Sequence, residues 1–519
     1  MSELTMLQIG EHSLAEKYSI PDDIEWMVFT PENFNQDLQA LVTKYKKDKK
    51  RLSFNMVIAT DLNEDVDLML LDNFVSSYTF FYTEGVESLT DEQHFFFKKK
   101  MSEQITQDNL DNFMVDLGIK FFSGQHGESV AANPTNYQVN PMYPKSFKYE
   151  GSKYIILDDD FGEEYYPIIS ATYNSYAPEK RKIEFWLEYV KDENVDIKVE
   201  LSQVSGRGTG NKLEKWSIED ANLHRPVVIS SDSSIRNIYC INIFVKGKGK
   251  AKIGHLHQRH TRIDQGFFIN GGKRIVDKNQ EELFYYFDPG DMKPPLNIYF
   301  SGYKSAEGFE GYYMMKKMGS PFMLITDTRL EGGGFYLGSE ELENGLIKVI
   351  QDKLEWLGFS NQELILSGIS MGTFGAMYYG LSLNPHAIIL GKPLLGVGDI
   401  ALNGRLHRPN EFDTVLDVML ANVEENDERA TKELNDIFWD KFAHSSLKNT
   451  KIYAAYMKED DYDPTAFYNL THKAAKIEKV IGHGYTGRHN DNSPAIVKWF
   501  LTEYRHVLNE FRGEKGNGL

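Results

Sequence analysis

The 519-residue sequence contains a single cysteine, Cys240, so no disulfide can form within the chain. A chain of this size without disulfides is typical of a reducing compartment. The sequence also lacks any run of about 18 apolar residues, the length that a membrane-spanning helix needs. Its first residues have neither the basic nor the apolar region of a signal peptide. These absences predict a cytoplasmic protein in which Cys240, within the strand-like run 237–245, is a small buried side chain.

Positive charge is scarce as well. The chain has 57 Lys and Arg against 76 Asp and Glu, which gives a net charge of −19 at pH 7. A nucleic-acid-binding protein presents a basic face, and anionic membranes attract basic segments, so neither class of partner is favoured. The length and the 41% content of hydrophobic residues allow two to four domains, each with its own core.

The first 290 residues show no nucleophile motif and no phosphate-binding loop. Residues 1–135 combine strand-like runs at 52–60 and 75–82 with a helix pair at 92–116, which predicts a mixed α/β interaction domain. A stretch rich in Gly, Pro, Asn and Ser, 124–151, predicts a linker.

Residues 152–290 alternate apolar and polar positions, as in Val195, Ile197 and Val199 between polar neighbours. Short alternating strands at close spacing predict an antiparallel, β-sandwich-like domain. The glycine-rich stretch 206–212 departs from the phosphate-loop pattern and lies between strands, so we interpret it as a hairpin loop.

Three histidines in this domain, His255, His257 and His260, form an H-x-H-x-x-H pattern. On a strand, His255 and His257 share a face, so a metal site is geometrically possible. The sequence places no carboxylate or thiolate beside them that would complete such a site. We therefore predict no metal and interpret the pattern as a solvated strand face.

The most specific motif lies further along, in the segment 364–380. An apolar run predicts a buried strand up to 367, and a helical segment follows from 371. Between them stands Gly368-Ile-Ser370-Met-Gly372, a G-x-S-x-G sequence, which is the tight turn on which α/β-hydrolases hold a nucleophilic serine. Glycine is needed on both sides because a Cβ would clash with neighbouring backbone. The alternative is a glycine-rich turn with an inert serine.

From about residue 294, strands alternate with helices, as in a parallel sheet. Together with the serine motif, this pattern predicts an α/β-hydrolase domain over 291–512. Helices at about 403–445 lie between two predicted sheet strands, where this fold often carries a helical cap. In α/β-hydrolases the chain order is serine, acid, histidine, with the histidine after the last strand.

The serine hydroxyl needs a base to accept its proton and an acid to orient that base. Carboxylates follow the strand-like run 451–457, and the position at the strand end favours Glu459 or Asp460 as the acid. Two histidines are candidates for the base: His483 directly follows the predicted last strand, 477–481, and His489 lies closer to the last helix. The residues alone leave both choices open.

Donors for an oxyanion are expected from two places. One is the loop after the strand 296–300, where Gly302 and Tyr303 stand, and the other is the backbone N–H of Met371, the residue after the serine. Gly302 suits the close approach of a ligand to the backbone, although an ordinary turn glycine is the alternative.

Three segments are recognisable as a set: 297–315, the stretch Ser-Gly-Ile-Ser-Met-Gly-Thr-Phe-Gly ending at 375, and Gly-Arg-His-Asn-Asp ending at 491. They resemble the second accessory secretory protein family of the accessory Sec system, which exports serine-rich-repeat glycoprotein adhesins. The length, the acidic balance and the three-part layout also fit, so the resemblance covers most of the chain.

The resemblance implies an O-acetyltransferase of α/β-hydrolase type that acetylates N-acetylglucosamine on the adhesin during export. It also implies a complex with two other accessory secretory proteins and cooperation with the accessory Sec motor ATPase, so that the protein associates peripherally with the membrane translocon. Ser370 matches the family nucleophile and His489 the family base, while the acid falls at Glu459 or Asp460. The sequence indicates neither a bound cofactor nor a particular acetyl donor.

Two other functions fit the same residues. A carbohydrate esterase or deacetylase would use the same triad with water as the acceptor. Alternatively, the chain is a non-catalytic export adaptor on a hydrolase scaffold, because its first 290 residues lack visible chemistry and suit partner binding.

Overall fold

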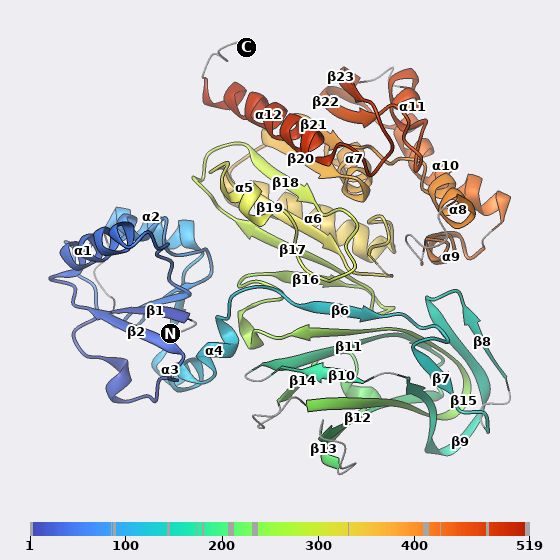
Figure 1. Ribbon diagram of the computed structural model, residues 1–519, viewed down its shortest axis with the longest axis horizontal. Helices are drawn as coiled ribbons and strands as arrows, with labels where there is room; N and C mark the ends of the chain where they lie inside the picture. Colours follow the sequence, from blue (N-terminus) through green and yellow to red (C-terminus); the bar gives the residue numbers. More distant parts are fainter. Residues whose placement is uncertain are drawn as a thin grey trace. The chain divides into compact units, whose positions relative to one another are not determined.

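The computed structural model describes residues 4–84, 86, 90–142, 146–172, 174–178, 181–205, 212–230, 237–330, 332–407, 415–425, 427–473 and 477–513. The chain forms two compact units (Figure 1). The first comprises Met1–Gln125, Thr261–Lys273 and Phe287–Met292, and the second comprises His126–His260, Arg274–Tyr286 and Lys293–Leu519. Among the helices of the described residues, none is long and apolar enough to cross a bilayer.

The first unit is built on a five-stranded sheet in the order β2-β1-β3-β4-β5, with each neighbouring pair parallel. Such sheets are buried on both faces, and apolar clusters accordingly contain alternate residues of the same strands, for example Leu7 in one and Met6 in the other. The elements are β1 (Leu4–Ile9), β2 (Ile24–Phe29), α1 (Phe34–Lys47), β3 (Met56–Ala59), β4 (Phe80–Thr83), α2 (Asp91–Lys100), β5 (Glu103–Ile105), α3 (Gln107–Met114) and α4 (Leu117–Lys120).

The second unit begins with a ten-stranded antiparallel sheet around two long strands, β9 and β15. The predicted antiparallel strands with alternating apolar residues are present. Because β15 pairs in turn with β6, β9, β10, β11 and β12, all ten strands belong to one hydrogen-bonded sheet. The strands are β6 (Gly127–Val130), β7 (Tyr137–Val139), β8 (Phe147–Glu150), β9 (Tyr154–Ala171), β10 (Ser175–Ala177), β11 (Lys182–Lys191), β12 (Val195–Ser205), β13 (Lys212–Glu219), β14 (Val227–Ser230) and β15 (Asn237–His260).

The predicted linker at 124–151 is wrong, because this segment contributes β6, β7 and β8 to the sheet. Tyr137 and Val139 lie on either side of the exposed Gln138 and are buried in the core of the sheet. Strands of three or four residues among Gly, Pro and Asn give too weak a period to be recognised. The stretch 206–212 lies outside the described residues except for Lys212, where β13 begins antiparallel to β12.

Cys240 is half-buried, and its Sγ lies 3.3 Å from Oδ1 of Asn174, so the predicted buried position is wrong. Side chains alternate between the two faces of a strand. Tyr239 and Ile241 of β15 face the core, which places Cys240 on the opposite face.

The rest of the second unit is an eight-stranded sheet in the order β16-β17-β19-β18-β20-β21-β22-β23, parallel from β19 to β23. Ligands bind at the carboxyl ends of such strands, and β18, β20, β22 and β23 all deliver their following loops to that edge. The strands are β16 (Lys273–Val276), β17 (Glu282–Asp288), β18 (Leu296–Phe300), β19 (Phe322–Asp327), β20 (Leu364–Ile369), β21 (Ala387–Gly391), β22 (Leu447–Met457) and β23 (Ile477–Tyr485).

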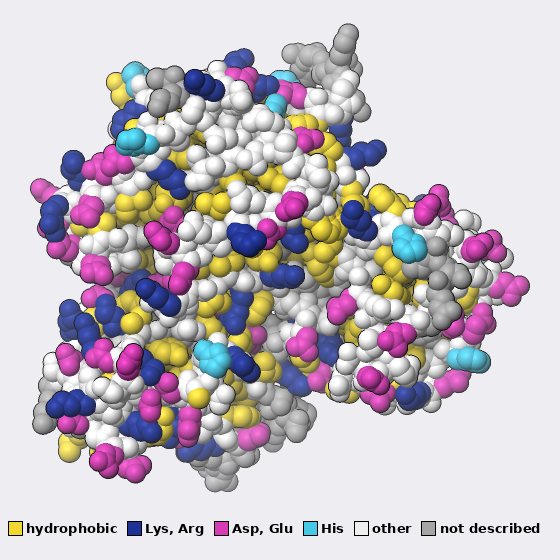
Figure 2. All heavy atoms as spheres, turned by 180° about the vertical axis from the view of Figure 1, so that it is seen from behind, with side chains coloured by type: hydrophobic (Ala, Val, Ile, Leu, Met, Phe, Trp, Pro, Cys, Tyr) yellow, Lys and Arg dark blue, Asp and Glu magenta, His cyan; other side chains and the backbone are white. Residues whose placement is uncertain are grey.

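Helices cover this sheet, and α7 is buried along nearly its whole length. Between β21 and β22 the chain inserts α8, α9 and α10, which overlap the region predicted as a cap. On the face drawn in Figure 2, basic and acidic side chains intermingle. The helices are α5 (Tyr312–Lys316), α6 (Glu340–Leu357), α7 (Met371–Leu383), α8 (Val397–His407), α9 (Asp417–Val423), α10 (Glu428–His444), α11 (Ala466–His472) and α12 (Ser493–Arg512).

Candidate active site

Ser370 occupies the sharp turn between β20 and α7, with φ 56° and ψ −124°. Residues other than glycine rarely adopt a positive φ, and such strain is characteristic of a nucleophile held in a tight strand-to-helix turn. The flanking glycines have a direct steric reason. A Cβ on Gly368 would lie 2.3 Å from the carbonyl carbon of Gly372, and a Cβ on Gly372 would lie 2.1 Å from the carbonyl oxygen of Phe300.

A hydrogen-bonded chain leads from Ser370 into the protein. The Oγ of Ser370 lies 2.9 Å from Nε2 of His489, and Nδ1 of His489 lies 2.9 Å from Oδ2 of Asp460. His489 and Asp460 are only 3% and 7% exposed. The other oxygen of Asp460 accepts the backbone N–H groups of Tyr462 and Asp463, which fixes the carboxylate. When Nδ1–H donates to Asp460, Nε2 is left to accept the serine proton.

Of the two predicted acids, Asp460 contacts His489, whereas the Glu459 side chain contacts the backbone of the loop that carries His489. The exposed Glu459 side chain accepts the backbone N–H of Gly487 at 2.5 Å. The next carboxylate, Asp461, accepts the backbone N–H of His489 at 3.0 Å. Glu459 and Asp461 therefore hold the backbone of the histidine loop, whereas Asp460 contacts the imidazole.

The structure places His489 beside Ser370 and leaves His483 on the sheet. Strand β23 extends to Tyr485, beyond the predicted end at 481, so His483 lies inside the strand and opposite Ala455 of β22. Its ring is exposed and packs against Tyr485 with a centroid distance of 4.6 Å. A strand that is four residues longer than predicted therefore removes His483 from the loop in which a base is expected.

Ser370 and His489 line a cleft with a volume of about 470 Å³. This volume is in the range of pockets that bind small molecules. The lining combines polar and apolar side chains, and the polar ones besides Ser370 and His489 are Tyr303, Glu310, Tyr462 and Asn490. The apolar lining comprises Phe335, Ile369, Met371, Leu394 and Ile400.

The three predicted oxyanion residues, Gly302, Tyr303 and Met371, all line this cleft. Met371 is the first residue of α7, so its backbone N–H has no acceptor within the helix, and the helix N-terminus favours negative charge. The backbone N–H of Gly302 donates to Oε2 of Glu310 at 2.8 Å. The Glu310 carboxylate therefore already accepts the hydrogen bond that Gly302 is predicted to donate to an oxyanion.

Sequence reasoning missed Glu310, which lies eight residues after Gly302 and lines the same cleft. The Tyr299 hydroxyl also hydrogen-bonds to Glu310. The hydrogen bond between Gly302 and Glu310 joins two parts of one loop. Local sequence patterns carry little information on how a loop folds back on itself. Its one sequence signal is its place within the recognisable segment 297–315.

Two of the three histidines of the β15 pattern are buried, so its interpretation as a solvated face is wrong. His255 and His257 are 0% and 1% exposed. Burial opposes the positive charge of His257, but the carboxylates of Glu307 and Glu188, 2.5 and 3.1 Å from its ring nitrogens, outweigh it and raise its pKa to about 9. Burial lowers the pKa of His255 to about 4. Within the described residues, no group of three or more His, Cys, Asp and Glu side chains is arranged to hold a metal ion.

Comparison with known proteins places this chain in a family. The family model described as accessory Sec system GspB-transporter matches residues 4–513. An accessory Sec system protein of Streptococcus gordonii is 37% identical over 99% of both chains, and one of Staphylococcus aureus is 38% identical over 97% of this chain and 96% of its own. A chain of the Glycosylation Associate Protein (Gap123) complex from Streptococcus agalactiae has a TM-score of 0.90 and 37% identity, with 98% of each chain covered. The resemblance seen in the sequence is thus confirmed, and the chain belongs to the accessory Sec system GspB-transporter family.

Proposed function

We propose that this protein is an O-acetyltransferase that transfers an acetyl group to N-acetylglucosamine on serine-rich-repeat adhesins in the accessory Sec system. The observation that carries the proposal is the hydrogen-bonded chain Ser370–His489–Asp460 at the wall of a small-molecule cleft. The acceptor class comes from the family resemblance. Asp460, rather than Glu459, is the acid in this proposal, because Asp460 contacts the imidazole.

In the first half-reaction, the Oγ of Ser370 attacks the acetyl carbonyl carbon and its proton passes to Nε2 of His489. The oxyanion is stabilised by the N–H of Met371 and by the loop at Gly302 and Tyr303. The bond to the donor's leaving group then breaks, and that group takes the proton from His489. Ser370 is left as an acetyl ester, so the reaction requires no resident cofactor.

In the second half-reaction, a sugar hydroxyl attacks the acetyl ester while His489 accepts the hydroxyl proton. The Ser370 oxygen leaves and takes that proton, and the sugar becomes the ester. Water can attack in the same way, so transfer requires an acceptor that fills the space beside the ester. The apolar part of the cleft lining, with Phe335 and Leu394, gives such an acceptor a surface to pack against.

We further propose that the chain works with two other accessory secretory proteins, the accessory Sec motor ATPase and the glycosylated adhesin, as a cytoplasmic protein peripheral to the membrane translocon. The similar chain from Streptococcus agalactiae was solved as part of a complex, which supports an assembly of this kind. No described residue of the first unit lines the Ser370 cleft, and we propose that this unit makes such contacts.

Acetyl transfer can be tested with the purified full chain, p-nitrophenyl acetate as the donor and methyl N-acetylglucosaminide as the acceptor. We expect mass spectrometry to detect the acetylated sugar, and the acceptor to shorten the lifetime of the acetyl-enzyme. A reaction without acceptor measures hydrolysis alone. Rapid release of acetate with no acetylated sugar would instead identify an esterase, and the absence of both reactions would favour an adaptor.

Glu310 provides a second test of the oxyanion site. Its carboxylate holds the Gly302 N–H in the resting structure, so an oxyanion must displace it. Replacing Glu310 with alanine should raise kcat/KM for p-nitrophenyl acetate by about tenfold, which corresponds to about 1.4 kcal/mol and is at the low end for a hydrogen bond to a charged group. Glu310→Asp, which keeps the charge on a shorter side chain, is the matched control. A fall in kcat/KM for Glu310→Ala would show that the carboxylate assists the reaction.

A further inference from the structure

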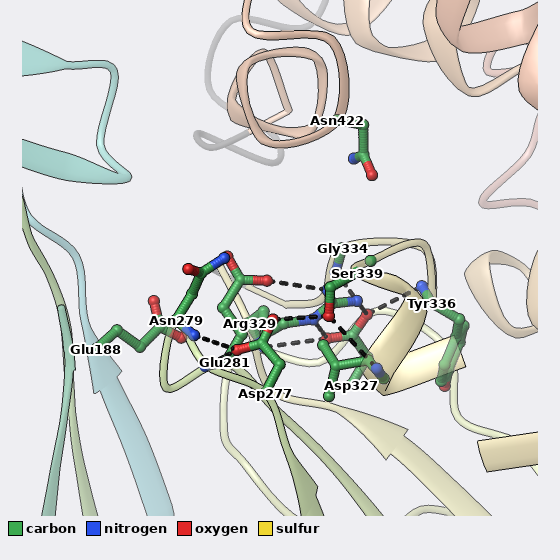
Figure 3. Close-up of polar contacts among 12 residues, drawn as sticks. Glu188, Asp277, Asn279, Glu281, Asp327, Arg329, Gly334, Tyr336, Ser339 and Asn422 are labelled. Atoms are coloured by element: carbon green, nitrogen blue, oxygen red, sulfur yellow. Dashed lines mark hydrogen bonds and ion pairs between the residues drawn. The ribbon is translucent and has the colours of Figure 1, made fainter. Parts of the chain in front are cut away.

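The second unit contains a polar cavity of about 220 Å³ that is lined by different residues from the cleft of Ser370 (Figure 3). Five parts of the chain contribute: the turn before β9, strand β11, the turn between β16 and β17, the loop between β19 and α6, and helix α9. In Figure 3, Asn422 of α9 stands across the cavity from Asp277 and Arg329.

Of the five charged residues that line the cavity, four take part in ion pairs. The fifth, Asp277, accepts hydrogen bonds from the Ser339 hydroxyl and from two backbone N–H groups. Lys153 Nζ lies 2.7 Å from one oxygen of Glu281, and Arg329 Nη1 lies 3.2 Å from the other. Arg329 also binds both carboxylate oxygens of Asp327. The carboxylate of Glu188, on β11, accepts a hydrogen bond from protonated His257. Buried charges persist when they are paired in this way. Among the described residues the Asp277 carboxylate has no ion-pair partner, so the wall disfavours an anionic ligand.

These pairs leave hydrogen-bonding capacity inside the cavity. Each oxygen of a carboxylate can accept two hydrogen bonds, and each oxygen of Glu281 takes one from the ion pairs named above. The half-buried amides of Asn279 and Asn422 at the rim offer both donors and acceptors. Leu330 and Leu337 add an apolar surface to the same lining. A ligand that fits must therefore carry no negative charge, be rich in hydroxyl groups and be apolar on one face.

We infer that this cavity is a binding site for a single neutral sugar ring. A sugar ring combines hydroxyl groups around its edge with a C–H face, which matches carboxylates and amides beside two leucines. The volume of about 220 Å³ is below that of pockets for drug-sized ligands, which excludes longer oligosaccharides from the interior. The ligand class follows from the cavity walls, so it does not depend on the proposed acetyl transfer.

The loop 329–339 separates this site from the cleft of Ser370. Leu330, Gly334, Leu337 and Ser339 line the cavity, whereas Phe335 in the middle of the loop lines the cleft. The backbone of the loop is fixed by Asp327, whose Oδ2 accepts the N–H groups of Gly334 and Tyr336, both at 2.9 Å. A sugar in the cavity would therefore touch a rigid wall whose other side faces the nucleophile.

Binding can be measured on the full chain by saturation-transfer difference NMR and isothermal titration calorimetry. Glucose and N-acetylglucosamine are the neutral probes, and glucuronate and glucosamine are ring-matched probes with negative and positive charge. We expect a neutral probe to bind with a Kd on the order of 1 mM, as for a ligand of this size, and glucuronate to bind at least about tenfold more weakly. Glucosamine should bind no more weakly than the neutral probes, because its ammonium group can lie beside the Asp277 carboxylate.

A pair of variants at one position assigns the binding to this cavity. Ala421 lines the cavity and is absent from the lining of the Ser370 cleft. Ala421→Phe fills the space and should raise the Kd at least about tenfold, whereas Ala421→Ser keeps the space and should leave the Kd unchanged. If Ala421→Phe does not fold, Asn422→Leu removes the rim amide at similar volume and should weaken binding by the same amount.

Equal binding of the neutral probes and glucuronate, no binding of either neutral sugar, or full binding by Ala421→Phe would each overturn the inference. Acetyl transfer is tested separately through Ser370. A chain that transfers acetyl groups but binds no sugar here would refute this inference alone, and a chain that binds sugar here without transferring acetyl groups would refute the proposed function alone.

Discussion

Replacing Ser370 with alanine is expected to lower kcat for p-nitrophenyl acetate by about 10⁴- to 10⁶-fold, the range found when the serine of a triad is removed. The reason is covalent: without Oγ no acetyl-enzyme forms, and His489 has no hydroxyl to deprotonate. Residual turnover would come from the oxyanion donors acting on water. The measurement is the steady-state rate together with mass spectrometry of the intact protein, which should show no acetylated form.

Two controls separate this chemistry from a fold defect. Ser367→Ala removes another buried serine hydroxyl three residues earlier, which donates to the carbonyl of Ile298, and it should keep kcat within about threefold. Ser370→Gly should lose the same activity as Ser370→Ala while raising the unfolding temperature, because glycine adopts φ 56° with little strain. An acetylated protein or near-normal turnover in Ser370→Ala would remove the serine from the mechanism.

The sharp turn that carries Ser370 could be predicted from sequence because its signal is local. Gly368, Ser370 and Gly372 are close together in the chain, and the clash that demands each glycine involves backbone one turn away or the neighbouring strand. A strand before the motif and a helix after it complete the same local pattern. The order of the loops after this turn, an acidic loop and then a histidine loop, narrows the candidates for the acid and the base to two residues each.

The partners of Ser370 could not be separated in the same way, because loop conformation selects them. Glu459 and Asp460 are adjacent, and which one faces His489 depends on the backbone path after β22, where the N–H groups of Tyr462 and Asp463 turn Asp460 inward. The exclusion of His483 depends on the true length of β23. Residues alone left both histidines open, and only the family resemblance favoured His489.

The burial of His255 and His257 on β15 could not be predicted from the sequence, for a related reason. Alternating histidines predict an exposed face, since charged and polar side chains are usually solvated. The carboxylates that allow His257 to be buried, Glu188 and Glu307, come from positions 69 and 50 residues away. Pairing at that separation leaves no periodic signal in the sequence. The prediction of a linker at 124–151 is wrong for another reason. The segment is rich in turn-forming residues, and its strands of three or four residues are too short to give a recognisable pattern.

Replacing Asp460 with asparagine is expected to lower kcat by about 10⁴-fold, nearly as far as loss of the nucleophile. The carboxylate of Asp460 accepts Nδ1–H from His489 and stabilises the imidazolium that forms when Ser370 is deprotonated. An asparagine amide would donate to Nδ1 instead, which places the proton on Nε2 and makes His489 unable to act as a base. The measurement is kcat with p-nitrophenyl acetate, together with NMR of the imidazole nitrogens to identify the tautomer.

Glu459→Gln is the matched control, because it makes the same chemical change one residue earlier. Its oxygen can still accept the backbone N–H of Gly487, so kcat should stay within about threefold of the original value. The pair of variants therefore decides an assignment that sequence position could not make. If Glu459→Gln lost 10⁴-fold and Asp460→Asn lost little, the acid loop would have to rearrange when substrate binds. Equal losses would mean that both carboxylates are needed, with Glu459 acting through the loop that carries His489.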